Sequence, residues 1–172
     1  MGYLDGIEIL AAASSSAFRL HASSMARTLI KSTLSSFGPL STASIRELCM
    51  QGCRESEYPD PEVWKPLLGS MKGLDTLWLV KSDCEPVLRI LETDRRSLTS
   101  MRSLRVCSDR PPSLQAVRAM AQARRDRGHP IQHLVIARRL EDADSWNGLV
   151  DIIGVVDVLR PHDFPAMSFM NR

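Results

Sequence analysis

A short frame of hydrophobic positions recurs along this chain in the form apolar-x-x-Leu-x-apolar. The clearest copies are Ile45-x-x-Leu48-x-Met50, Leu74-x-x-Leu77-x-Leu79, Met101-x-x-Leu104-x-Val106 and Ile131-x-x-Leu134-x-Ile136, and a weaker copy, Ala17-x-x-Leu20-x-Ala22, precedes them. The central leucines follow one another at intervals of 28, 29, 27 and 30 residues. Such a regular frame predicts short strands whose successive copies pair in parallel in one sheet.

Helical patterns fill the intervals between the frames. We expect helices over residues 24–35, from about 60 to 71, from 85 to 91, from 113 to 128 and from 142 to 153. Pro61 is suited to a first helical position, and Ser113 and Gly128 are suited to the two ends of the fourth helix. Residues 155–159 predict a last strand that closes the array.

Strands and helices that alternate at this period predict an α/β fold, a right-handed solenoid of about five leucine-rich repeats with a concave parallel sheet and outer helices. We expect the repeat domain to span residues 1–160, most clearly 44–159, and residues 161–172 to form a loosely attached tail. Because no N-terminal cap is evident, the apolar edge of the first turn is expected to be open, which would make the isolated chain marginally stable or prone to aggregation.

The residues between the inward positions of each strand should point to the concave face. Trp78 is the most informative of them, because an exposed aromatic residue on a strand is typical of a binding surface. The alternatives are that a neighbouring loop covers Trp78 or that the predicted register is shifted. The predicted partner-binding residues are Trp78, Arg105, Arg46, Arg102, His133 and Asp75.

Composition and charge indicate a folded globular chain. The 172 residues are 44% hydrophobic and 24% charged, and the net charge of +2 does not favour nucleic acid or membrane as a partner. The basic run from Arg124 to Arg127 lies at a helix end, where we expect it to be in solvent. No apolar run is long enough to span a bilayer. Four cysteines without a CxxC pair favour a reduced compartment, cytoplasmic or nuclear.

Candidate catalytic and metal motifs are weak in this sequence. GxSxG, GxGxxG and phosphate-binding glycine loops are absent from it. Cys49 and Cys53 with His129 or His133 lack the second close pair of a zinc site. We therefore expect no catalytic residue, no metal and no cofactor. The alternative, a small hydrolase that depends on Cys49 or His133, lacks a recognisable catalytic arrangement.

The stretch GHPIQHLVIARRLEDADSWNGLVDIIGVVDVL, residues 128–159, resembles the last repeat in the leucine-rich-repeat regions of many fungal F-box-type proteins. SLTSMRSLRVCSDRPP is similar to the repeat before it, and the resemblance extends more weakly back to about Ser44. It implies a substrate-recognition region of a ubiquitin-ligase adaptor that holds a protein target on its concave face. No segment from Met1 to Leu40 matches the F-box that would recruit the ligase, so the ligase becomes a partner only if an F-box is supplied. The alternatives are a stand-alone repeat scaffold and a truncated fragment, neither of which has a function in ubiquitin transfer.

Overall fold

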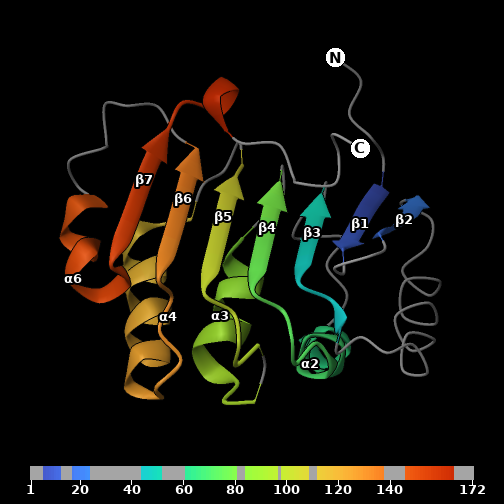
Figure 1. The fold of residues 1–172 in the computed structure, drawn as a ribbon, viewed down its shortest axis with the longest axis horizontal. Coiled ribbons are helices and arrows are strands. Elements are labelled where there is room, and N and C mark those ends of the chain that lie inside the picture. The colour runs from blue at the N-terminus through green and yellow to red at the C-terminus, as the bar shows by residue number, and fades with distance from the viewer. Residues whose placement is uncertain are drawn as a thin grey trace.

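A seven-stranded sheet organises the molecule, in the order β2-β1-β3-β4-β5-β6-β7 (Figure 1). The computed structural model describes residues 6–12, 17–23, 44–51, 61–80, 84–96, 98–108, 112–137 and 146–164. The strands are β1 (Gly6–Ala12), β2 (Ala17–Ser23), β3 (Glu47–Gln51), β4 (Thr76–Val80), β5 (Ser103–Cys107), β6 (His133–Ala137) and β7 (Val155–Leu159). Strands β3 to β7 pair in parallel and in sequence order, whereas β1 is antiparallel to both β2 and β3.

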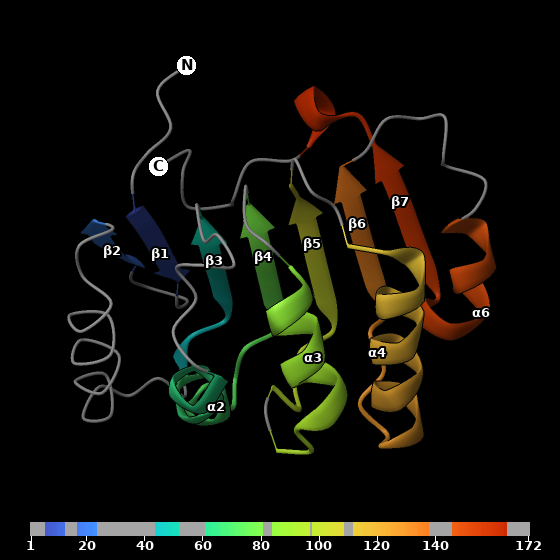
Figure 2. The same ribbon diagram turned by 180° about the vertical axis from the view of Figure 1, so that it is seen from behind.

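The helices that connect the parallel strands lie together on one face of this sheet (Figure 2). They are α2 (Pro61–Ser70), α3 (Glu85–Thr93), α4 (Leu114–Asp126) and the short α6 (Val150–Ile153), which follows the 3-10 turn η5 (Asn147–Leu149). A second 3-10 turn, η6 (Pro161–Asp163), follows β7. The predicted α/β class and its parallel sheet are confirmed. Of the predicted fifth helix, the structure describes η5 and α6, whereas residues 142–145 lie outside the described residues, as does the helix expected over residues 24–35.

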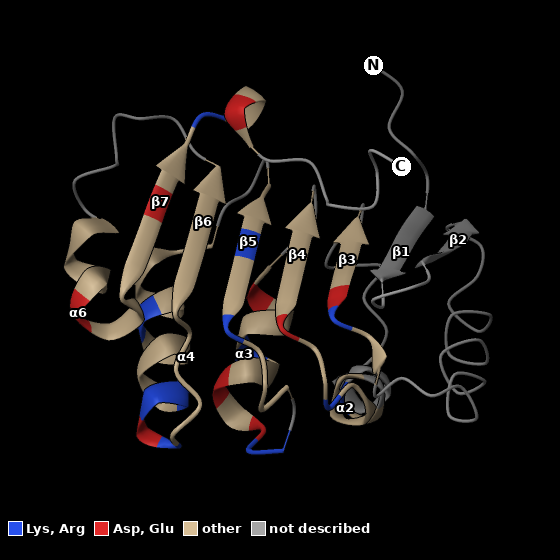
Figure 3. Ribbon diagram, viewed as in Figure 1, with Lys and Arg blue, Asp and Glu red and all other residues tan. Residues whose placement is uncertain are grey.

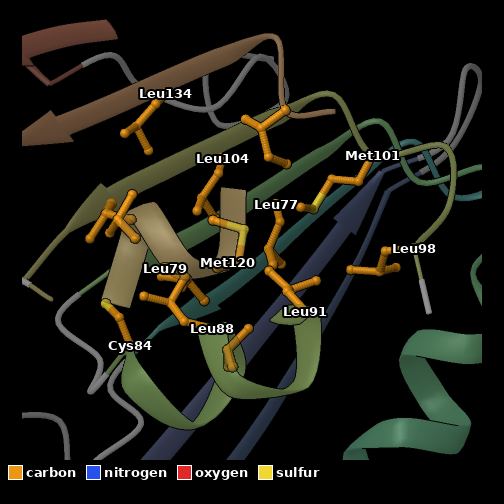
Figure 4. Packing of buried hydrophobic residues seen from close by; sticks show 14 of the residues in the cluster. Leu77, Leu79, Cys84, Leu88, Leu91, Leu98, Met101, Leu104, Met120 and Leu134 are labelled. Carbon is orange, nitrogen blue, oxygen red and sulfur yellow. The ribbon is translucent and has the colours of Figure 1, made fainter. Parts of the chain in front are cut away.

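The predicted leucine frame sets the register of the parallel strands. Leu48, Leu77, Leu104 and Leu134 pair in line across β3 to β6, and Val156 of β7 continues the column. This column and the one two residues later are buried against the helices, because successive strand residues point to opposite faces. Leu88 and Leu91 of α3 and Met120 of α4 complete this core (Figure 4).

The weak first copy of the frame is not the first parallel strand. Leu20 lies in β2, where it pairs with Ile9 of the antiparallel strand β1 and not with Leu48. A short connection between β1 and β2 favours this local hairpin over a parallel pairing, which needs a long crossover. Strand β1 then pairs along β3. The edge that the sequence predicted to be open is therefore covered by a hairpin.

A repeated pair of backbone hydrogen bonds joins each turn to the next, just before the strands begin. The carbonyl of Arg46 accepts from the N–H groups of Asp75 and Thr76 at 2.9 and 3.0 Å. Equivalent pairs of N–H groups donate to the carbonyls of Asp75 and Arg102, and the carbonyl of Gln132 accepts from Val155. The periodicity of the sequence is thus repeated in the backbone.

Helix α4 has both of the predicted ends. The Ser113 side chain accepts from the N–H of Ala116 at 3.1 Å. At the other end Gly128 has a φ of +77°, and the N–H groups of Gly128 and His129 donate to the carbonyls of Arg125 and Arg124. These two bonds form a Schellman motif, which glycine favours because it has no Cβ to clash in the left-handed region.

The basic run at the end of α4 does not lie wholly in solvent, as was expected. Arg124 is only 2% exposed, and its Nη2 donates to the carbonyls of Leu98 and Met101 at 2.9 and 3.0 Å. Arg127 is half-buried, and it donates to the carbonyls of Leu91 and Asp94 near the end of α3. The sequence prediction failed because backbone carbonyls of the preceding turn face this side of α4 and accept hydrogen bonds from its arginines.

Candidate functional site

The face of the sheet opposite the helices carries the side chains that are candidates for binding; we call it the open face. It is made by the strand residues that alternate with the core leucines. Figure 3 shows that charges on its strands are few, with a basic band on β5 and acidic bands on β7 and at the start of β3. These bands are Arg105, Asp157 and Glu47, each the only charged residue of its strand.

Trp78 lies in the middle of β4 and forms the centre of a small aromatic cluster on the open face. It pairs in register with Cys49 on one side and with Arg105 on the other. The Arg105 guanidinium carbon lies 4.5 Å from the centre of the Trp78 ring, a cation–π distance. The ring of Phe164, which follows η6, meets Trp78 edge-on with a centroid distance of 5.7 Å.

This cluster corrects the expected exposure of Trp78, which is only 3% exposed. Phe164 and Arg105 both contact it, and Val80 and Phe164 are partly buried against the pair of Cys49 and Trp78. The alternative that a neighbouring segment covers Trp78 is therefore the correct one. Of the residues predicted to form a tail, 161–164 are described, and Phe164 among them packs on Trp78; residues 165–172 lie outside the described residues.

His133 forms a second polar group on the open face. Its Nε2 lies 2.7 Å from Oδ2 of Asp157 on the neighbouring strand β7. Because an ionised carboxylate can only accept, the ring N–H donates in this contact. Both side chains are partly exposed, at 36% and 48%. A partner could therefore reach this pair without any rearrangement of the sheet.

The remaining predicted site residues form a line at the amino ends of the strands. Arg46, Asp75 and Arg102 occupy equivalent positions before β3, β4 and β5, and all three are exposed. The Arg46 guanidinium donates to the carbonyl of Gly73 at 3.0 Å. This line is separated from the Trp78 cluster by three residues along the strand, a distance of about 10 Å. The structure therefore divides the predicted site into a central cluster and a charged border.

Two residues of this face were missed from the sequence. Asp157 could have been found, because Val155-Val156-Asp157-Val158-Leu159 alternates and places the carboxylate opposite the core valines. Phe164 gave no comparable signal, since it follows the last strand and lies between a short turn and a proline. Its position depends on a contact with a strand far away in sequence.

The residues considered as catalytic or metal-binding candidates do not lie together in one site. Cys49 is buried on β3, whereas His133 lies on β6 with two strands between them. Across residues 6–164, excluding the gaps in the description, no group of three or more His, Cys, Asp or Glu is placed to hold a metal ion. Cys53 lies outside the described residues. None of the helices described is both long and apolar enough to cross a membrane.

Comparison with known proteins identifies no relative of this chain. No protein-family model matches the chain, and no curated protein and no solved structure matches it significantly.

Proposed function

We propose that this chain is a leucine-rich-repeat solenoid that binds a protein partner on the open face of its sheet. The arrangement that carries the proposal is a run of parallel strands in sequence order whose connecting helices all lie on one face. In repeat proteins of this kind the opposite, concave face is the usual binding surface.

The side chains on the open face suit a protein partner. Trp78 and Arg105, which belong to the residue types most common in binding hot spots, are in contact at its centre. The pair of His133 and Asp157 adds hydrogen-bonding groups that are partly exposed. A buried aromatic centre beside partly exposed polar groups is typical of protein interfaces.

The resemblance to fungal F-box-type repeats makes target recognition for a ubiquitin ligase the first biological function to test. A stand-alone scaffold uses the same face without a ligase. Co-purification of Skp and cullin subunits with the natural gene product would favour the adaptor, and their absence alongside a bound target would favour the scaffold.

Affinity capture with matched variants tests the proposed binding face. The open-face variant is Arg105→Ala with His133→Ala, and the control is Arg89→Ala with Gln115→Ala, which changes exposed residues of α3 and α4 on the helical face. We expect at least one protein to be recovered by the wild type and the control, and to bind the open-face variant at least tenfold more weakly once it is purified. Equal recovery by all three baits, with each bait folded by circular dichroism, would refute the open face as the binding surface.

A further inference from the structure

The neighbourhood of Trp78 contains buried polar atoms that have no hydrogen-bond partner among the described residues. They are Nε1 of Trp78, Nε of Arg105 and Oγ of Ser103. Two of them, the indole and guanidinium nitrogens, can only donate. Native proteins rarely leave buried donors unsatisfied, and such a group calls for a ligand or another explanation. Among the described residues, therefore, no acceptor is in hydrogen-bond contact with the Trp78 indole N–H or the Arg105 Nε–H.

Arg105 also lacks a counter-charge. Within the described part of the chain its guanidinium makes the contact with the Trp78 ring and no ion pair. The carboxylate of Asp157 lies in the same row of the sheet, but two strands away, and it is already in contact with His133. A half-buried arginine on an aromatic face is well suited to receive a carboxylate from outside.

Phe164 reaches this cluster from outside the sheet. The three residues of η6 that precede it are exposed. Figure 1 shows that this turn lies beyond the carboxyl ends of the strands, so that it forms no part of the sheet. Displacement of Phe164 would expose Trp78 and would leave the backbone of the sheet unchanged.

We infer that Phe164 holds the place of a ligand, and that the cluster takes a linear peptide segment in which an aromatic residue adjoins an aspartate or glutamate. The aromatic ring of the peptide replaces Phe164 on Trp78, and its carboxylate accepts from Arg105 and the indole N–H. The chain's own Asp163-Phe164 pair has this composition. The Asp163 carboxylate lies 3.5 Å from Nε2 of His162, and among the described residues it makes no ion pair with Arg105. Phe164 is therefore the internal competitor, and it lowers the affinity for the partner. This inference rests on the proposed function, because it names the chemistry of the partner at the same face.

A peptide with the sequence of residues 160–164, carrying a fluorescent label, is the probe that tests the inference. Its fluorescence anisotropy is measured with the wild-type chain, with Phe164→Ala, and with Val150→Ala as the matched control at an exposed apolar residue of α6. We expect Phe164→Ala to bind the peptide at least tenfold more tightly than the wild type or the control, because removal of an internal competitor raises the apparent affinity.

Variants of the peptide separate the two parts of the recognition. Replacement of its phenylalanine by alanine should weaken binding at least tenfold. Replacement of its aspartate by asparagine should weaken binding to Phe164→Ala but have little effect on a Phe164→Ala, Arg105→Gln protein. Phe164→Leu repeats the measurement with a smaller change, should Phe164→Ala perturb the fold.

Equal affinity of the peptide for all the proteins, or no binding to any folded variant, would overturn the inference. A partner that is captured through the open face in the preceding experiment, while the peptide fails to bind, would leave the proposed function standing and reject the inference alone. Failure of both experiments would reject both.

Discussion

Arg124 illustrates how a charged side chain is kept inside this core. Burial of a guanidinium costs solvation free energy unless its donors are satisfied. Burial, together with the nearby charge of Arg127, lowers the pKa of Arg124 to about 10, so the group stays protonated at neutral pH. One of the carbonyls that it binds belongs to Leu98, whose φ of +50° lies in the left-handed region that leucine seldom adopts. Arg124 therefore stabilises the strained turn before β5.

Arg124→Met is expected to destabilise the chain by about 2 to 3 kcal/mol, because it keeps an apolar stem but removes the side-chain donor from the Met101 carbonyl and leaves the Leu98 carbonyl with only the N–H of Met101. Urea unfolding followed by circular dichroism measures the change. Arg125→Met is the control: this residue is exposed and donates to the carbonyl of Asp151, so its loss should cost less than about 1 kcal/mol. Equal stability of the two variants would contradict the conclusion that the hydrogen bonds of Arg124 stabilise the turn before β5.

At the scale of elements, helix α4 is capped by Gly128 because glycine adopts the left-handed backbone conformation there, and not because a larger side chain would clash. A Cβ built on Gly128 meets nothing within 4 Å. Any cost of substitution must therefore come from the left-handed backbone, where alanine is disfavoured and asparagine is tolerated.

Gly128→Ala should lower the free energy of unfolding by about 1 kcal/mol, and Gly128→Asn by less. Thermal or urea unfolding of the two variants beside the wild type measures this order. If Gly128→Asn lowers the free energy of unfolding as much as Gly128→Ala, the left-handed backbone of the Schellman motif does not determine the effect of the substitution.

The elements that follow local patterns were the ones that the sequence could predict. The leucine frame located β3 to β6, and the flanking Pro112-Ser113 and Gly128 located the ends of α4. The hairpin of β1 and β2 was not predicted, because its segments carry no strong turn signal and its pairing with β3 is a long-range contact. The contact of Phe164 with Trp78 was missed for the same reason, since periodicity describes neighbours along a helix or strand and not distant partners.

At the scale of the whole molecule, the extensive contacts join neighbouring elements: each parallel strand contacts the next, α2 contacts α3, α3 contacts α4, and α4 contacts α6. In the repeat solenoid that we propose, stability is approximately a sum over turns and the interfaces between them. The central turns have neighbours on both sides, whereas strands β2 and β7 lie at the two ends of the described sheet.

Native-state hydrogen exchange should reflect this one-dimensional arrangement. We expect the slowest amides in β4, β5 and β6 and in α3 and α4, with protection falling toward β2 and toward β7, because the ends of the array can open without the middle. Mass spectrometry of exchanged peptides resolves these elements. Uniform protection across all seven strands would instead indicate a single cooperative unit.

The carbonyls of Arg46, Asp75 and Arg102 each bind a pair of N–H groups, and these bonds determine where the chain can change in length. They fix the register at one point in each turn, and the aligned positions Leu48, Leu77, Leu104, Leu134 and Val156 follow at intervals of 29, 27, 30 and 22 residues. The segments that return from one strand to the next absorb the difference. Insertions and deletions in the returning segments are therefore compatible with an unchanged sheet, so that the molecule can be lengthened or shortened on its outer side while the open face keeps its spacing.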